Sequence, residues 1–281
     1  MPITTHPISA SLGVELRGLD PRKLGDNDVA AFRDAFQNKH LVLLRGFEGL
    51  AEDESVGLAE RIGRISSAGA NMGGGKRFTL ISNMHPQGRL PDGELLFHAD
   101  HMFLPHPLKA ISLYALAVPA QGGETRFLDA ASAYASLPES TKRRLDGLQA
   151  RHVYDYGANT GNRPPERGAL PEGATTAVHS LVTTHPETGR KILFVCRMFT
   201  TEIIGLPRDE GDALLDELLT HLDQCGSDYD HHWQVGDFVV WDNRILQHAR
   251  KDFPSSQKRA MRRAPIADER SLQTPQQEVA A

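Results

Sequence analysis

Hydrophobic positions along the chain follow two patterns, one typical of buried strands and the other of amphipathic helices. Residues 41–44 form a continuous apolar run that Gly46 ends, as in a strand buried on both faces. Residues 209–222 repeat leucine at helical spacing, which predicts a helix with one buried face. Further strands are predicted at residues 13–16, 110–118, 177–183, 191–195 and 238–241, and further helices at residues 26–36, with Asp26 as N-cap, and 54–62. Because strands predominate, the pattern favours a β-barrel or a double-sheet jelly roll decorated with helices.

Two long segments contain too little apolar surface to form core elements of their own. They cover residues 66–94, which include a glycine-rich stretch, and residues 157–176, which include several prolines. Long loops inside a compact domain are usually functional lids or disordered connections, and the composition leaves both alternatives open. The tail at residues 269–281 is rich in Gln and Glu and is expected to be flexible. No internal repeat is visible, and a length of 281 residues suits one large domain or two modest ones.

Composition excludes several classes of partner and compartment. The 281 residues carry a net charge of −5, so the chain has no excess of cations for general binding to nucleic acids or anionic membranes. Two cysteines, Cys196 and Cys225, cannot build a disulfide framework, which favours a reducing compartment. The first residues lack the pattern of a secretory signal, and no apolar run is long enough to span a membrane. We therefore expect a cytoplasmic protein.

A candidate metal site is formed by residues from two distant segments. In a strand, His98 and Asp100 would project to one face, so that both could bind the same cation. His248 follows a predicted buried strand and a turn at Asp242 and Asn243, and it is the candidate third ligand. Two imidazoles and one carboxylate form the facial triad that leaves positions open on iron(II). A zinc hydrolase could use the same donors, so the triad alone leaves that alternative open.

Five motifs occur in order along the chain and together resemble the taurine dioxygenase (TauD/TfdA) family of iron(II)- and 2-oxoglutarate-dependent dioxygenases. The resemblance covers residues 10–268 and is carried by the ordered set, since each motif alone is weak. The motifs are His98-Ala99-Asp100, Gly122-Gly123-Glu124-Thr125, the Thr184–Arg190 hairpin, Trp241-Asp242-Asn243-Arg244 with His248, and the arginines of residues 259–263.

The resemblance implies a mostly β, α+β fold with a double-stranded β-helix core, the cupin-like jelly roll, in a single catalytic domain. It implies that His98, Asp100 and His248 hold the iron, while Thr125 and Arg259 bind the distal carboxylate of 2-oxoglutarate. Dioxygen is then the other cosubstrate, and the reaction hydroxylates a C–H bond and releases succinate and CO2. A silent cupin-like protein that only binds a small acid is the non-catalytic alternative. A zinc hydrolase would not explain Thr125 together with Arg259.

The resemblance also implies a set of substrate-binding residues. Arg263 is expected to bind an anionic group of the substrate, with a structural ion pair as the alternative. Phe199 matches an aromatic pocket wall, whereas Glu94 stands where the taurine enzyme has an asparagine, so taurine itself is not expected. Asn71, in the first long loop, is a further candidate contact. An organic acid, a sulfonate or an amino-acid-like substrate remains open, as does a homo-oligomeric assembly.

The other histidines and the motif residues around them are expected to be structural. His101 would point away from His98, and the adjacent His231 and His232 face opposite sides of a strand. His185 is expected to shape its hairpin. Trp241 and Asn243 are expected to shape the turn before His248.

Overall fold

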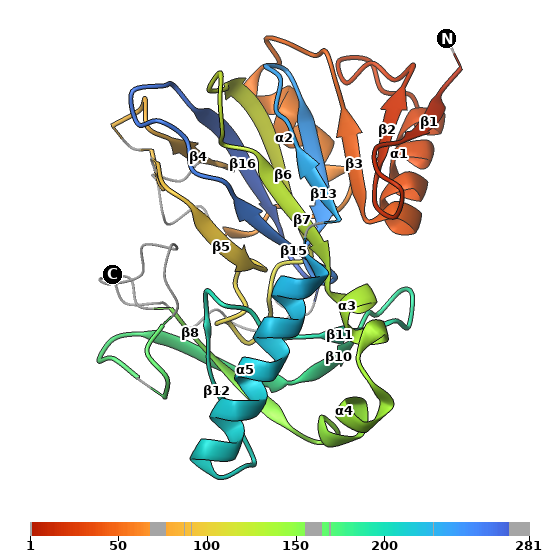
Figure 1. The fold of residues 1–281 in the computed structure, drawn as a ribbon. Helices are drawn as coiled ribbons and strands as arrows, with labels where there is room; N and C mark the ends of the chain where they lie inside the picture. Colours follow the sequence, from red (N-terminus) through yellow and green to blue (C-terminus); the bar gives the residue numbers. More distant parts are fainter. Residues whose placement is uncertain are drawn as a thin grey trace.

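The computed structural model describes residues 2–67, 77–86, 88–90, 92–154, 165–168, 170–226 and 228–269. Strands predominate among them, as predicted, and form two large sheets and two small ones (Figure 1). The seven-stranded sheet has the order β1 (Thr4–Pro7), β2 (Val14–Arg17), β3 (Leu41–Leu44), β14 (Phe238–Asp242), β6 (Ala110–Ala117), β16 (Ala260–Ile266), β4 (Thr79–Ser82). The four-stranded sheet has the order β13 (Tyr229–His231), β7 (Thr125–Asp129), β15 (Leu246–Arg250), β5 (Leu95–His98).

The apolar run at residues 41–44 explains how the two layers are held together. Leu41 and Leu43 of β3 belong to a core cluster that also contains Phe127 of β7 and Leu246 of β15, so they face the four-stranded sheet. Val42 and Leu44 belong to a second cluster, which contains residues of helices α1 (Asp26–Lys39) and α2 (Glu52–Glu60). Because successive side chains of a strand point to opposite faces, the run is apolar at every position. The predicted double-sheet core is confirmed.

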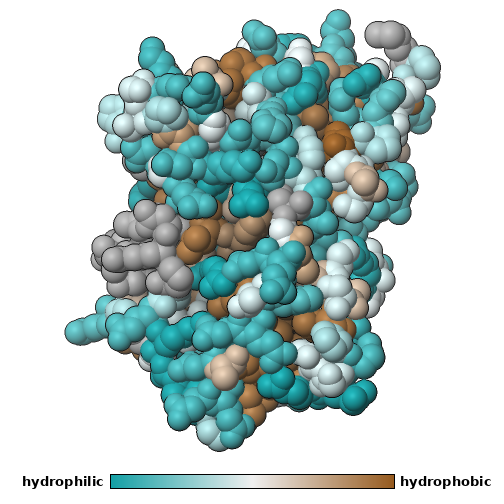
Figure 2. Space-filling model, viewed as in Figure 1, coloured by the Kyte–Doolittle hydropathy of each residue, from teal (hydrophilic) through white to brown (hydrophobic). Residues whose placement is uncertain are grey.

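The remaining elements lie together in the lower part of the molecule in Figure 1. They are β8 (Gln149–Tyr154), β9 (Thr175–Ser180) and β12 (Thr200–Ile204) in one small sheet, β10 (Val182–Thr184) and β11 (Lys191–Leu193) in the other, and helices α3 (Ala130–Ser136), α4 (Glu139–Arg144) and α5 (Arg208–Cys225). Helix α5 buries Leu214, Leu215, Leu218, Leu219 and Leu222, as its leucine spacing predicted. On the face drawn in Figure 2, apolar residues gather mainly between the upper and lower parts.

Two predictions about single elements were wrong. Gly25, not Asp26, is the N-cap of α1, because the Asp28 carboxylate reaches back to accept the Gly25 N–H at 2.8 Å. The strand predicted at residues 177–183 is split between two sheets by the fully buried Leu181.

The prediction of one long loop at residues 66–94 was also wrong, because this segment contains strand β4, which pairs with β16. The described part of the chain leaves out residues 68–76, which include Asn71, residues 155–164 and the tail beyond residue 269. The predictions made for these residues stay untested. No helix of the described part is long and apolar enough to span a membrane.

Candidate metal and cosubstrate site

Strand pairing brings together two of the three candidate ligands, His98 and His248. His98 ends β5 and lies directly opposite His248 of β15 in the antiparallel register, with ring centroids 4.2 Å apart. Asp100 follows two residues later, and one donor atom from each of the three residues lies within 4.8 Å of the others. Strand β5 ends at His98, so the prediction that His98 and Asp100 share a strand face was wrong in its reason. A turn, and not a strand, brings Asp100 back to the histidines.

The protonation states of these groups suit a metal ion. His98 Nδ1 donates to the Leu96 carbonyl at 2.7 Å, and the other ring nitrogen, Nε2, faces Asp100 Oδ1 at 3.4 Å. Burial lowers the pKa of His248 to about 3, so its imidazole is neutral, and its buried Nδ1 has no hydrogen-bond partner among the described residues. Burial opposes ionisation of Asp100, but the Arg263 guanidinium outweighs it and holds the pKa of this carboxyl well below its usual value. Two neutral imidazoles and an anionic carboxylate are the forms that bind a divalent cation.

Arg263 of β16 directly contacts Asp100, the candidate carboxylate ligand of the metal. Its Nε and Nη2 donate to Asp100 Oδ2 at 3.1 and 2.6 Å. The ion pair expected as the alternative for Arg263 is therefore present, and it engages the oxygen that does not face His98. Binding of substrate by Arg263 stays a prediction.

Arg259 is a buried cation in need of an anion. It is 2% exposed, and its Nε is 3.4 Å from the Gly123 carbonyl, with no carboxylate paired to it among the described residues. Burial, together with the nearby Arg250, lowers the pKa of Arg259 to about 9. Gly123 has φ +73°, and a Cβ there would lie 3.3 Å from Arg259 Nε, so glycine leaves room beside the guanidinium. A buried charge without its partner is costly, and a carboxylate would relieve that cost through bidentate hydrogen bonds.

Thr125 lies on the same face of the four-stranded sheet as the histidines, two residues further along the paired strands. In β7 it pairs with Arg250, two residues beyond the pair of Phe127 and His248. Two residues along a strand span about 7 Å, a distance suited to a five-carbon dicarboxylate with one end at the metal. Trp233 Nε1 donates to Thr125 Oγ1 at 3.0 Å, so the hydroxyl proton is directed to another acceptor. Sequence reasoning missed Trp233, because its partner lies 108 residues away and no spacing on its own segment indicates the contact.

An aromatic cluster borders the histidines. Phe199 packs edge-on against His98 with ring centroids 5.5 Å apart, and it also contacts Phe103 and Tyr154. Phe103 and Tyr154 stack at 4.7 Å. The predicted wall residue Phe199 therefore lies beside a ligand candidate. Glu94 is exposed and lies one residue before β5.

A second group of donors, His40, His185 and Asp242, also has one atom from each within 4.8 Å of the others, but His185 and Asp242 are already engaged in hydrogen bonds. His185 Nε2 donates to Asp242 Oδ2 at 3.0 Å and its Nδ1 accepts the Thr188 N–H, which fixes the hairpin as predicted. Arg244 engages both Asp242 oxygens, at 3.0 and 2.6 Å. In contrast to Asp100, this carboxylate has no oxygen left for a cation.

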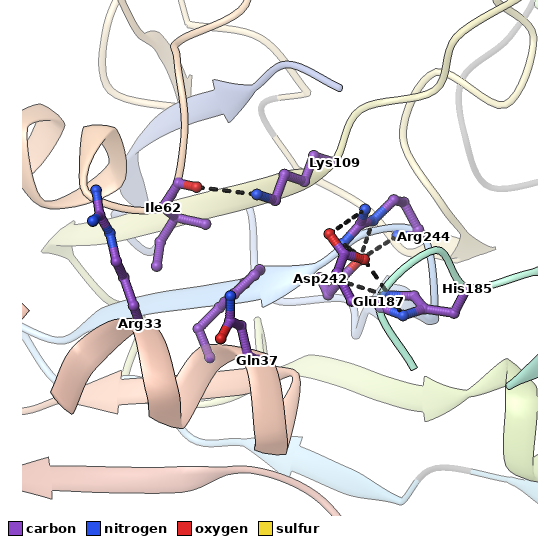
Figure 3. Close-up of a pocket in the computed structure, with 9 residues that line it drawn as sticks. Arg33, Gln37, Ile62, Lys109, His185, Glu187, Asp242 and Arg244 are labelled. Atoms are coloured by element: carbon purple, nitrogen blue, oxygen red, sulfur yellow. Dashed lines mark hydrogen bonds and ion pairs between the residues drawn. The ribbon is translucent and has the colours of Figure 1, made fainter. Parts of the chain in front are cut away.

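A cavity of about 230 Å³ adjoins this second group (Figure 3). Besides Arg244, the cations Arg33 and Lys109 line the cavity, and both donate to main-chain carbonyls near the C-terminal end of α2. Arg33 Nε donates to the Arg61 carbonyl at 2.5 Å, and Lys109 Nζ donates to the Ile62 carbonyl at 3.2 Å. Cations stabilise this end of a helix. The cavity is therefore lined by structural contacts.

Comparison with known proteins places this site in a family. The family model "Taurine catabolism dioxygenase TauD, TfdA family" matches residues 2–264. Pentalenolactone F synthase of Streptomyces arenae is 32% identical over 93% of this chain and 94% of the relative. The alpha-ketoglutarate-dependent 2,4-dichlorophenoxyacetate dioxygenase of Cupriavidus pinatubonensis is 30% identical over 96% of this chain and 99% of the relative.

Solved structures agree in fold over similar lengths. The crystal structure of AAD-2 in complex with Mn(II) and N-oxalylglycine has a TM-score of 0.79 at 25% identity, covering 96% of this chain and 98% of that one. A taurine dioxygenase from Burkholderia xenovorans has a TM-score of 0.76 at 27% identity, covering 95% and 91%. The jelly-roll fold, the donor set and relatives matched over nearly their full length lead to one conclusion: this chain belongs to the TauD/TfdA family and is a non-haem iron dioxygenase that depends on 2-oxoglutarate.

Proposed function

We propose that this dioxygenase hydroxylates a C–H bond of a small anionic organic substrate, with His98, Asp100 and His248 as its iron ligands. One observation carries the ligand assignment: in this His/His/Asp group a histidine nitrogen and a carboxylate oxygen remain free and face each other. Bound iron would supply the activation of dioxygen, coupled to conversion of 2-oxoglutarate into succinate and CO2. We also propose that residues 1–281 form a single catalytic domain.

The chain's own residues bind and orient the cosubstrate. Arg259 supplies the buried positive charge for the distal carboxylate, and the Thr125 hydroxyl, oriented by Trp233, donates a further hydrogen bond. Each hydrogen bond to a charged group contributes about 1.5–3 kcal/mol. The burial of Arg259 and the absence of a paired carboxylate among the described residues support this assignment. No observation favours the zinc hydrolase or the non-catalytic binding protein.

The prime substrate would be held by charge at one end and by rings at the other. Arg263 uses Nε and Nη2 on Asp100, while its Nη1 has no partner among the described residues and is available to an anion. Phe199 beside His98 offers an apolar wall. Relatives named for 2,4-dichlorophenoxyacetate, phenoxypropionate and sulfate esters act on acidic compounds, which supports an anionic substrate. Glu94 and Asn71 are proposed as further contacts that select among such acids.

The test combines cosubstrate binding with a substrate panel. Under anaerobic conditions, iron(II) and 2-oxoglutarate should give a visible charge-transfer band, which His98→Ala and Asp100→Ala should abolish. Succinate release and oxygen uptake are then measured over aryloxy acids, sulfonates, sulfate esters and amino-acid derivatives, each compared with an uncharged analogue. No band and no 2-oxoglutarate-dependent oxygen uptake would contradict the ligand assignment. Turnover confined to neutral substrates would contradict the anionic substrate class.

A further inference from the structure

Asn243 lies in the turn between β14 and β15, yet its side chain reaches a different segment. The residue is 1% exposed. Its Oδ1 accepts the Asp100 main-chain N–H at 2.7 Å, and its Nδ2 donates to the Asp100 carbonyl at 3.0 Å. Nδ2 also donates to the Leu108 carbonyl at 3.0 Å. One amide therefore binds both main-chain groups of Asp100 and the far end of the loop that follows it.

Asp100 needs such a contact because it lies outside any strand. Strand β5 ends at His98, so no ladder hydrogen bonds continue through Asp100. The next residue, His101, has φ +63°, a left-handed conformation that is uncommon for residues other than glycine. The main-chain position of Asp100 is therefore not determined by the sheet that positions His98 and His248. The Asn243 amide supplies this missing constraint.

Asn243 is itself firmly held. Its main-chain N–H donates to the Lys109 carbonyl at 3.0 Å, and the preceding Asp242 N–H donates to the His40 carbonyl at 2.8 Å. Strand β15, which carries His248, begins three residues after Asn243. The turn that leads into the strand of one ligand thus binds the backbone of another.

We propose that Asn243 is a positioning residue that fixes Asp100 relative to His98 and His248 and thereby sets the affinity of the metal site. The inference rests on the proposed ligand assignment. It adds a second role to the expected one, in which Asn243 shapes the turn before His248. Asparagine suits the role because its amide combines one acceptor with two donors.

Two substitutions separate this role from simple stabilisation. Asn243→Ala removes all three side-chain bonds. Asn243→Asp keeps the size and the acceptor for the Asp100 N–H, but its second oxygen faces the carbonyls of Asp100 and Leu108. An added negative charge near a cation site would by itself tighten metal binding, so weaker binding by Asn243→Asp would report lost geometry.

The matched control is Tyr114→Phe. Tyr114 is 2% exposed, and its hydroxyl also makes two buried main-chain bonds, accepting the Leu50 N–H and donating to the Phe47 carbonyl, both at 2.9 Å. Its loss should lower thermal stability without a change at the metal site. Asp100→Ala tests the ligand assignment separately.

The experiment is a titration of the metal-free proteins with Co(II), followed by visible absorption, below the melting temperature of every variant. Loss of contacts that orient a ligand costs about 10- to 100-fold in metal affinity. We expect that increase in Kd for both Asn243 variants, with an altered d–d spectrum, and a Kd within twofold of wild type for Tyr114→Phe. Co(II) affinity that stays within twofold of wild type in Asn243→Asp, while Asp100→Ala loses it, would overturn the positioning role alone. Unchanged affinity in Asp100→Ala would overturn the ligand assignment itself. If Asn243→Ala does not fold, the equal-sized Asn243→Asp decides.

Discussion

Arg263 Nη2 lies 2.6 Å from Asp100 Oδ2, so the candidate carboxylate ligand is charge-paired on one oxygen and free on the other. The pair directs Oδ1 toward His98 and keeps Asp100 ionised. It also leaves one nitrogen of the guanidinium for a second anion, next to the place where the reaction is proposed to occur. One arginine can thus order a metal ligand and bind a substrate.

Arg263→Met, assayed with iron(II) at saturation, should weaken substrate binding more than cosubstrate binding. Loss of one charge-assisted hydrogen bond, worth about 1.5–3 kcal/mol, corresponds to about a 10- to 150-fold rise in substrate KM. The KM for 2-oxoglutarate should change by less than about threefold, since a different arginine binds it. Steady-state kinetics with an active acid from the panel checks this, with Arg197→Met, which breaks a surface pair with Asp223, as control. A larger rise in the 2-oxoglutarate KM than in the substrate KM would reverse the assignment.

Arg259→Met should have opposite effects on binding and on stability. The dissociation constant of 2-oxoglutarate should rise by about 10- to 150-fold, because the distal carboxylate loses its charged donor. The ligand-free protein should melt at the same temperature or higher, since an uncompensated buried charge is replaced by an apolar chain. Calorimetric titration and thermal melts measure the two effects. A lower melting temperature with unchanged cosubstrate affinity would mean that Arg259 is structural.

Trp233→Phe tests how the Thr125 hydroxyl is oriented. The variant keeps a ring against His231, which lies 4.4 Å away in a T-shaped contact, but removes the N–H donor to Thr125. A neutral hydrogen bond contributes about 1 kcal/mol, so the Kd for 2-oxoglutarate should rise about fivefold. Metal affinity in the absence of 2-oxoglutarate should not change. Thr125→Val should reproduce the effect, and additive losses in the double variant would show that the two residues act independently.

His152 should contribute to destabilisation by acid. It is fully buried, its Nε2 has no partner in the described part of the chain, and burial lowers its pKa from 6.5 to about 3. Between these values the unfolded chain binds more protons than the folded one, so the free energy of unfolding falls as the pH drops from about 6.5 toward 3. This contribution is absent above pH 7. Urea unfolding of His152→Phe at pH 7.5, 6 and 5 should give a shallower pH dependence than wild type, whatever its absolute stability. An equal slope would show that His152 takes up a proton in the folded protein as readily as in the unfolded chain.

Pattern and motif together determined much of this protein from the sequence. The apolar run at residues 41–44 predicted a strand buried on both faces, because alternate side chains must then all be hydrophobic. The leucines of α5 predicted its buried face. The order of motifs pointed to His98, Asp100 and His248 as one group, which the structure brings together.

The reasons behind the grouping came from tertiary structure alone. Asp100 reaches the histidines through a turn held by Asn243, and that contact joins residues 143 positions apart. The fold also brings together a second His/His/Asp group. Only the hydrogen bonds of the structure show that Arg244 already binds its carboxylate and that Thr188 already binds one of its imidazoles. Periodicity records which face of an element is buried, because burial repeats along the element. It does not record which distant polar groups satisfy one another, since a hydrogen bond between segments leaves no repeat in either of them.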